Sequence, residues 1–481
     1  MIKILIEKEL KSILLSPKFA SIFAVCSILI VLSVYIGIQE YRGAMAYYET
    51  NNSLVLQERK DIKSYRGINT SVTRRPDPMQ IFVSGIHNDI GKQAYISQSE
   101  TISLNRSNYE DNSIFAVFRS MDLMFIFQIV LSLFAVLFTY DAINGEREKG
   151  TLKLSFANPV PRSIYIIAKL AGSWFGLVIP LLIPLLLGMS MVLIYNVPMT
   201  GDHWLRLGMF LSLSFLYFSF FICLGVLVSS MTRESSNSFL YLLVIWISFV
   251  LLIPGGGVMV AGKFVPVQTT AEISAMISKN YRELYDQYND RSDKRYQELR
   301  SKIQNLPPDL SHEERKKRTD ELYAGLSKQN DEDSNRTSGA IEKYDALLNE
   351  DWRNKKAVRE KLGFSLSRIS PASAYQLSAM DIAETNISLK NRHEDQLRNY
   401  RDIFNRYRSK KEKESGGDSF QSLMSGDRKP LDLSDMPEFR YEKTGIISIL
   451  EADIRDIGII SIYILLAAAG AVTAFLKYDV R

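Results

Sequence analysis

Cysteine and histidine are scarce in this sequence, which leaves little basis for a disulfide framework or a metal centre. Of 481 residues, two are cysteine and four are histidine. Cys26 and Cys223 both fall inside apolar runs, so no disulfide framework connects the polar segments. The histidines lie in unrelated segments without the short spacings of metal ligands. They are His87, His203, His312 and His393. We therefore expect no metal site and no cofactor in this chain.

The sequence also lacks a large excess of charge of one sign. The formal net charge is +5 at neutral pH. The longest polar stretch, 263–455, holds nearly equal numbers of acidic and basic residues. Because nucleic-acid partners call for clustered positive charge, this balance argues against nucleic acid as a partner.

Long apolar runs are what the sequence has in abundance. The mean hydropathy of −0.03 hides a sharp separation into apolar runs and polar stretches. An apolar helix of roughly 18–20 residues is long enough to cross the hydrocarbon core of a membrane. The runs predict a mainly α fold, with a six-span transmembrane helical bundle and a mostly helical extracytoplasmic domain.

The ends of the apolar runs set the predicted boundaries, and the sidedness follows from the charged loop described below. The boundaries are an interfacial cytoplasmic helix at 1–18, a first span at 19–39, an extracytoplasmic region at 40–122, a second span at 123–140, a cytoplasmic charged loop at 141–164, a third span at 165–195, a short outer loop at 196–206, a fourth span at 207–230, a cytoplasmic turn at 231–237, a fifth span at 238–262, a large extracytoplasmic domain at 263–455, a sixth span at 456–477 and a cytoplasmic tail at 478–481.

The first apolar run has two interpretations. Before it, Ile2, Ile6, Leu10 and Ile13 share one helical face, as in a helix lying on a membrane surface. The alternative is a cleaved secretory signal, because residues 44–46 resemble a processing site. A signal has a short leader and an apolar core of about 7–15 residues, whereas this run is longer and follows a leader that contains acidic residues. The length favours a permanent span.

Residues 141–169 form a charged segment between the second and third spans. Gly145 and Gly150 bracket four charged residues, and Pro159 and Pro161 stop the apolar piece that follows. Only a short helix fits between these breakers. The basic residues are Arg147, Lys149, Lys153, Arg162 and Lys169. An excess of Lys and Arg in a short loop marks the cytoplasmic side, so we expect this loop and both termini to be cytoplasmic.

The order of residues in this loop resembles a known family. The pattern Asn144-Gly-Glu-Arg-Glu-Lys-Gly-Thr-Leu-Lys-Leu154, followed by Asn158-Pro-Val-Pro-Arg162 and a span opening at Lys169-Leu-Ala-Gly172, resembles the coupling segment of type-2 ABC exporter permeases. In that family a short cytoplasmic helix sits in a groove of a separate ATPase subunit. The resemblance implies an ATPase contact at Asn144, Gly145, Glu146, Arg147, Glu148, Lys149, Gly150, Thr151 and Leu152. An ordinary charged loop that only sets topology is the alternative.

The resemblance also implies the partners. They are two copies of an ABC ATPase subunit, a second permease as homodimer or sibling heterodimer, membrane lipid, and, for the outer domain, an envelope partner. ATP and Mg would be bound by the ATPase subunit, so this chain itself is not expected to be an enzyme. The large insert between the last two spans resembles one bacterial subgroup of the family, which implies the bacterial inner membrane as the location.

A glycine-rich segment ending in Lys263 is close to a phosphate-binding loop but fails its requirements. Such a loop needs Ser or Thr after the lysine to hold Mg²⁺, and here Phe264 follows. The run Gly255-Gly256-Gly257 is more simply interpreted as a break in the fifth span or as a point of close packing. The sequence therefore predicts no nucleotide site of its own.

Small and polar residues within the spans predict how the helices pack. Gln128 is expected to hydrogen-bond to a neighbouring helix, and Gly172 with Gly176 forms a motif that permits close helix approach. The sixth span is rich in alanine and glycine over 467–474, which predicts an intimate contact there. Pro180 and Pro184 should kink the third span. No charged residue lies in the central part of any predicted span, which argues against an ion pathway.

The polar stretches predict mostly helix. Capping boxes begin at Thr269 and Ser311, and a Pro-Pro pair near 305–308 predicts a helical hairpin. Residues 80–83 and 94–97 are candidates for short strands, and 41–58 for a continuation of the first span. Residues 365–384 are predicted to lie along the outer membrane surface as an amphipathic helix, and 414–429 to form a mobile loop. His393 is expected to be a core or boundary residue.

Three functions remain on these grounds. The first is an ATP-driven exporter permease, and the lack of buried charge in the spans favours an apolar or amphipathic substrate. The second is a mechanical transmitter that passes no substrate and drives an envelope partner. The third is a membrane-embedded hydrolase, which needs an acid, base or metal constellation that these spans lack.

Overall fold

In the computed structural model, the described residues are 2–62, 68–86, 93–96, 104–105, 121–157, 159–307, 311–414 and 431–477. The chain divides into two compact units. Unit 1 holds Met1–Val258 and Phe364–Arg481, and unit 2 holds Met259–Gly363. The stretch 263–455, which the sequence treats as one outer domain, is therefore shared between them. The predicted tail at 478–481, Asn158 and nearly all of the loop at 414–429 lie outside the described residues.

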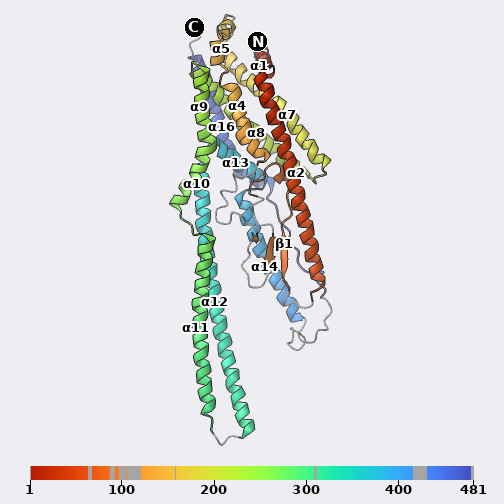
Figure 1. Ribbon diagram of the computed structural model, residues 1–481, viewed down its shortest axis with the longest axis vertical. Helices are drawn as coiled ribbons and strands as arrows, with labels where there is room; N and C mark the ends of the chain where they lie inside the picture. The colour runs from red at the N-terminus through yellow and green to blue at the C-terminus, as the bar shows by residue number, and fades with distance from the viewer. Residues whose placement is uncertain are drawn as a thin grey trace. The chain divides into compact units, whose positions relative to one another are not determined.

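Within the part of the chain that the structure describes, six helices are long and apolar enough to cross a membrane (Figure 1). This result confirms the predicted helical membrane bundle. The spans are α2 (Pro17–Lys60), the joined α3, η4 and α4 (Leu123–Phe125, Ile126–Leu131 and Ser132–Thr139), α7 (Arg162–Ile194), α8 (Gly201–Met231), the joined α9, η5 and α10 (Ser235–Ile247, Ser248–Leu252 and Ile253–Phe264) and α16 (Ile446–Leu476). As expected, α2 continues well past the apolar run.

The amphipathic segment forms α1 (Ile2–Leu14), which packs directly on α7. The glycines of the predicted motif make this contact possible. A Cβ added at Gly172 would lie 2.6 Å from the Glu9 Cβ, and one added at Gly176 would lie 3.1 Å from the Ile13 side chain. The motif therefore serves helix packing, between α1 and α7.

The small residues of the last span allow α16 to pack closely on α8. Ala467 and Ala471 are buried, and a Cβ added at Gly470 would meet the Leu227 side chain at 3.1 Å. Because small side chains let two backbones approach closely, this face packs intimately, as the composition predicts.

The glycine run at 255–257 does not break the fifth span. Helix α10 continues through it to Phe264. The alternative interpretation, close packing, holds for Gly257, where an added Cβ would lie 2.7 Å from the backbone nitrogen of Ser367. Gly257 therefore allows the segment at Ser367 to pack directly on α10.

The prediction that 365–384 lies along the membrane surface is wrong. This segment forms α13 (Pro371–Ile382), in which ten of twelve residues are buried. Its Tyr375 ring stacks on Tyr217 of α8 at a centroid distance of 4.5 Å. The Tyr375 hydroxyl also lies 2.9 Å from the Ser214 hydroxyl. The low charge of this segment thus reflects burial inside the bundle, which leaves no polar face for a membrane surface.

Helix α13 contacts two π-helical segments, η4 and η5. Gln376 of α13 accepts a hydrogen bond of 3.2 Å from Gln128 of η4, which confirms that Gln128 bonds to a neighbouring helix. Ser370, which caps α13, donates to the Phe249 carbonyl of η5. A π-bulge displaces carbonyl groups from the regular helical ladder. The Gln128 carbonyl accordingly accepts from Tyr217 at 3.0 Å.

The remainder of unit 1 combines a small sheet with one long helix. Strands β1 (Thr70–Thr73), β2 (Gln93–Ile96) and β3 (Leu104–Asn105) form an antiparallel sheet in the order β1-β2-β3. The other strand candidate, at 80–83, does not form a strand. Its first two residues belong to a 3₁₀ turn, η2 (Pro78–Ile81). Asp122 joins this region to the second span, because the Ser84 and Phe125 backbone N–H groups both donate to its carboxyl group at 2.8 Å.

Helix α14 (Ile387–Glu414) carries the histidine on its apolar stripe. His393 is 1% exposed and packs edge-on against Phe439 and Tyr441, with ring centroids 5.7 and 5.9 Å away. Burial, helped by the charge of Arg74, lowers the pKa of His393 to about 3. A neutral core histidine is therefore confirmed.

Unit 2 is built on a hairpin of two long helices. Helix α11 (Thr270–Gln304) opens with the predicted capping box at Thr269, and α12 (His312–Ser367) follows Ser311. The two helices lie side by side in Figure 1. Arg291 and Arg295 of α11 pair with Asp333 of α12 at 3.0 and 2.8 Å. The predicted hairpin is present, although Pro308 lies outside the described residues.

Candidate functional site

The charged loop between the second and third spans folds into two short helices. They are α5 (Asn144–Glu148) and α6 (Thr151–Phe156). Gly150 separates them with a φ of +72°, a left-handed conformation that favours glycine. Within unit 1, α5 lies at the same end as α1 (Figure 1). This pair of helices, α5 and α6, is called the loop helices below.

Asn144 attaches α5 to the turn between α8 and α9. Its side chain is fully buried and donates to the Thr232 hydroxyl at 2.9 Å and to the Glu234 carbonyl at 3.2 Å. The Ser229 hydroxyl donates back to the Asn144 side-chain oxygen at 3.0 Å. A buried amide with this many partners has one orientation, so the start of α5 is fixed to α8.

Glu148 makes a second attachment to the same turn. Its carboxylate accepts from the Ser235 backbone N–H at 2.7 Å and from the Ser235 hydroxyl at 2.9 Å. Ser235 begins α9, and a carboxylate at a helix N-terminus is stabilised by the exposed N–H groups and the helix dipole. The end of α5 is therefore tied to the fifth span.

Glu146 faces the opposite way, toward α1 and α7. It accepts from the Tyr165 hydroxyl and from Lys169 at 3.0 Å. Lys169 also donates to Glu9 of α1 at 2.7 Å, and Lys8 of α1 reaches Glu146 at 3.3 Å. The side chains of Lys169 and Glu9 are 7% and 10% exposed. Three helices thus meet at one charge cluster, defined as Lys8, Glu9, Glu146 and Lys169.

The charge cluster is electrically neutral, with two cations and two carboxylates. Burying a charge without a partner is costly, whereas paired and hydrogen-bonded charges are tolerated. Lys169 lies between Glu9 and Glu146 and neutralises both. Moving α5 away from α7 would separate these charges, so α1, α5 and α7 are expected to move together.

The predicted contact residues divide into an inward and an outward set. Inward, Asn144 and Gly145 are buried and Glu146 is in the charge cluster. Leu152 is 1% exposed and packs among Ile143, Tyr165, Ile166 and Phe475. Outward, Glu148, Lys149, Gly150 and Thr151 are exposed, and Arg147 is half-buried.

Two exposed residues of α6 were not among the predicted contacts. Lys153 is exposed, and Leu154 is 70% exposed, which is unusual for a leucine on a short helix that buries Leu152 on its other side. The outward face of the loop helices is therefore basic with one apolar residue, and is defined here as Lys149, Gly150, Thr151, Lys153 and Leu154.

The residues that hold the loop helices in place were not predicted from the sequence. They are Glu9, Tyr165, Ser229, Thr232 and Ser235, with Lys169 known only as a marker of sidedness. The sequence shows that Glu9 lies on the amphipathic segment and that Lys169 lies at the start of a span, but it does not show that the two are in contact. Their spacing of 160 positions gives no local clue.

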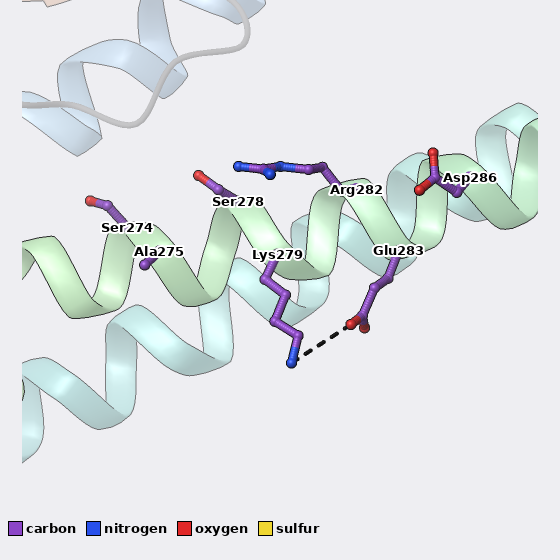
Figure 2. Close-up of a pocket in the computed structure, with 7 residues that line it drawn as sticks. All are labelled: Ser274, Ala275, Ser278, Lys279, Arg282, Glu283 and Asp286. Atoms are coloured by element: carbon purple, nitrogen blue, oxygen red, sulfur yellow. Dashed lines mark ion pairs between the residues drawn. The ribbon is translucent and has the colours of Figure 1, made fainter.

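An open depression on α11 is the other surface feature of note. It has a volume of about 370 Å³. Figure 2 shows that its side chains all extend from one helix, with Lys279 paired to Glu283, and that they do not converge on a common point. A depression on one charged helix face has the character of ordinary solvated surface. Within the described residues, no group of three or more His, Cys, Asp or Glu side chains is arranged to hold a metal ion.

Comparison with known protein families gives a match over most of the chain. The model of a protein family described as "ABC-2 family transporter protein" matches residues 4–480, which is nearly the whole chain. No curated protein matches this chain.

Proposed function

Because the chain belongs to the ABC-2 family of transporter proteins, we propose that it is the permease of an ATP-driven exporter and that a separate ATPase subunit binds its loop helices. Proteins of this family are the transmembrane component, which works with an ABC ATPase. In the proposal, the outward face defined above, with Arg147 and Glu148 beside it, contacts the ATPase. Asn144, Gly145, Glu146 and Leu152 lie behind this face and position it.

The observation that carries the proposal is the attachment of the loop helices on two sides. Asn144 and Glu148 bond to the turn between α8 and α9. Glu146 bonds to α7 and α1 through Lys169 and Lys8. A push on the outward face therefore reaches four helices through polar contacts, of which the Ser229–Asn144 and Lys169–Glu9 contacts are buried. An ordinary loop that only sets topology has no need for such contacts.

The proposed assembly follows from the family and from the basic loop. Two permeases, identical or siblings, pair in the bacterial inner membrane and bind two ATPase subunits that hold ATP and Mg. The short loop with several Lys and Arg residues supports a cytoplasmic location for the loop helices and both termini. Closure of the ATPase dimer would then displace the loop helices and open a path outward for an apolar or amphipathic substrate.

The contact is tested with Leu154→Asp in the full chain, expressed in its native membrane. A charge on the apolar part of the outward face should abolish copurification of an ATPase that carries a nucleotide-binding loop. The matched control is Leu347→Asp, which changes a leucine that is 58% exposed on α12. Retention of the ATPase by Leu154→Asp, or equal loss in both variants, contradicts the proposal.

The loop helices are also tested with the double variant Glu146→Ala, Arg147→Ala, which changes one residue of the inward set and one of the outward set. We expect the permease to remain inserted in the membrane while the ATPase detaches or hydrolyses ATP without stimulation. The measurement is the ATPase turnover of the reconstituted complex. Unchanged stimulated turnover would count against the assignment of this loop.

A mechanical transmitter is the second candidate, and the hairpin of unit 2 favours it. Helix α12 has 56 residues, a length of about 84 Å at about 1.5 Å per residue. Such a rigid element suits the transfer of force to an envelope partner. The two functions separate in vesicles that hold the purified complex. An exporter accumulates a compound while it hydrolyses ATP, whereas a transmitter hydrolyses ATP and accumulates none.

A further inference from the structure

Three aspartates meet in unit 1, where α13 ends beside α16. Asp381 is in the last turn of α13, and Asp453 and Asp456 lie one turn apart on α16. Asp453 and Asp456 are both fully buried. Nothing in the proposed coupling to an ATPase uses these residues, and they lie in the half of α16 that precedes its close contact with α8 near Gly470.

One of the three carboxyl groups, that of Asp456, forms an ion pair with an arginine. Arg368, which follows α12, donates to Asp456 at 2.7 Å. Arg455 is 3.9 Å from the same oxygen of Asp456 and is itself largely exposed. This pair accounts for the charge of Asp456, and it leaves Asp381 and Asp453 to be explained.

Among the described residues, no N–H or O–H group forms a hydrogen bond of ordinary geometry with either oxygen of Asp453. The Ser378 hydroxyl is close by, and the carboxyl group of Asp381 is within hydrogen-bonding reach. Asp381 also accepts from the Asn386 side-chain amide. A fully buried carboxyl group thus has another carboxyl group as its main polar neighbour.

The other cation near this cluster is already engaged. Arg206 of α8 donates to Asp202 at 2.7 Å, to the Ile382 carbonyl at 3.1 Å and to the Thr444 carbonyl at 2.9 Å. Its nearest further carboxylate is Glu384, at 3.6 Å. The charged groups that face Asp381 and Asp453 are therefore Arg368 and Asp456, with Arg455 and Arg206 at the edges.

Two carboxyl groups in contact, one fully buried and the other partly buried, cannot both be ionised at low cost. A hydrogen bond between them exists only when one of the two carries a proton. Burial raises the pKa of Asp381, and the charge of Asp456 raises it further, while Asn386 and Arg368 oppose this effect. The direction of this shift agrees with the geometry.

We propose that Asp381 and Asp453 bind one shared proton and that this proton holds α13 against α16. The ligand of this site is the proton itself. This proposal does not depend on the ATPase contact or on the direction of transport. The shared proton can therefore be disproved while the proposed function stands, and the reverse is also true.

The sign of the pH dependence follows from the raised pKa. A carboxyl group with a raised pKa in the folded protein stabilises the fold at low pH, and this contribution is lost as pH rises through the raised value. Above that value both aspartates are charged, and they repel each other inside the bundle. Helix α13 also packs on α8, η4 and η5, so loss of the proton loosens a contact shared by four spans.

The proton is detected directly by infrared difference spectroscopy on the full chain in lipid nanodiscs, titrated from about pH 5 to about pH 9. We expect the C=O stretch of a buried protonated carboxylic acid, which disappears at high pH. Asp453→Asn and Asp381→Asn should each abolish this band. The control is Glu451→Gln, an exposed carboxyl group on the same helix, which should leave the band unchanged.

Thermal unfolding over the same pH range gives the second readout. The midpoint of wild type should fall by several degrees as pH rises, whereas Asp453→Asn should be nearly flat and at least as stable as wild type at high pH. Asp381→Asn serves as the second variant if one substitution fails to fold. Absence of the band in wild type, or a wild-type pH profile in both asparagine variants, overturns the proposal.

Discussion

At the scale of single residues, Lys169 is the side chain that joins α1 to the loop helices. It lies between Glu9 and Glu146, and it is the shared partner of two carboxylates that come from different helices. The buried cluster is stable because the positive and negative charges balance. Removing Lys169 leaves two carboxylates near each other with only the partly exposed Lys8 to pair with Glu146.

Lys169→Ala is therefore expected to be strongly destabilising. Breaking a buried ion pair by removing one partner costs about 3–5 kcal/mol. The measurement is the thermal unfolding midpoint in detergent, together with ATPase stimulation in the reconstituted complex. The control is Lys11→Ala, which removes an exposed pair with Glu7 on the same α1 and should change neither quantity measurably. Equal effects of the two variants would show that the buried cluster has no special role.

At the scale of helices, close approach decides the packing of unit 1. Helices α1 and α7 touch where Gly172 has no side chain, and α16 and α8 touch where Gly470 has none. The π-helical segments η4 and η5 contact α13. Their carbonyl groups accept hydrogen bonds from Tyr217 of α8 and from Ser370, which caps α13. The glycines and π-bulges are thus the points where one element accommodates another.

Gly172→Ala should separate α1 from α7. The new methyl group would lie 2.6 Å from the Glu9 Cβ, which cannot turn aside because it is fixed to the backbone of α1. We expect a lower unfolding midpoint and weaker ATPase stimulation, because the Glu9–Lys169 pair shifts with α1. The measurements are the same two as for Lys169.

The matched control for this substitution is Gly208→Ala on α8. An added Cβ there meets nothing within 4 Å, and alanine is favoured over glycine in a helix by about 1 kcal/mol. Gly208→Ala should therefore be neutral or stabilising. If Gly172→Ala behaves in the same way, α1 is not held closely to α7.

At the scale of the whole molecule, the membrane divides the chain into parts with different surroundings. The loop helices follow the second span, and the hairpin of unit 2 lies between the fifth and sixth spans. With five spans before it, the hairpin is expected on the face opposite to both termini. The proposed function requires this arrangement, since an ATPase is available only in the cytoplasm.

Cysteine labelling tests this topology. Lys153→Cys and Asn305→Cys place thiols on the loop helices and at the end of α11, whereas the natural Cys26 and Cys223 lie within spans. A membrane-impermeant maleimide should label Cys at position 305 in intact cells and Cys at position 153 only after permeabilisation. Labelling of position 153 in intact cells would invert the topology and remove the basis for an ATPase contact.

The sequence alone determined the features that depend on neighbours along the chain. The six spans, the capping box at Thr269 and the packing glycines of α7 were predicted because apolar length, capping residues and small residues act locally. Only one short helix was predicted in the charged loop, whereas the structure has two, and Gly145 lies within the first of them. These local signals were also sufficient for the family, which rests on the order of residues in the loop and on the spans around it.

Only the tertiary structure decided the contacts between distant segments. The burial of α13, the Glu9–Lys169–Glu146 cluster and the meeting of Asp381 with Asp453 join segments separated by many tens of residues. A carboxylate or a run of small residues has the same sequence whether it faces water, lipid or a partner. Its free energy depends on which side chains the fold brings against it, so its role became apparent only when the helices were in place.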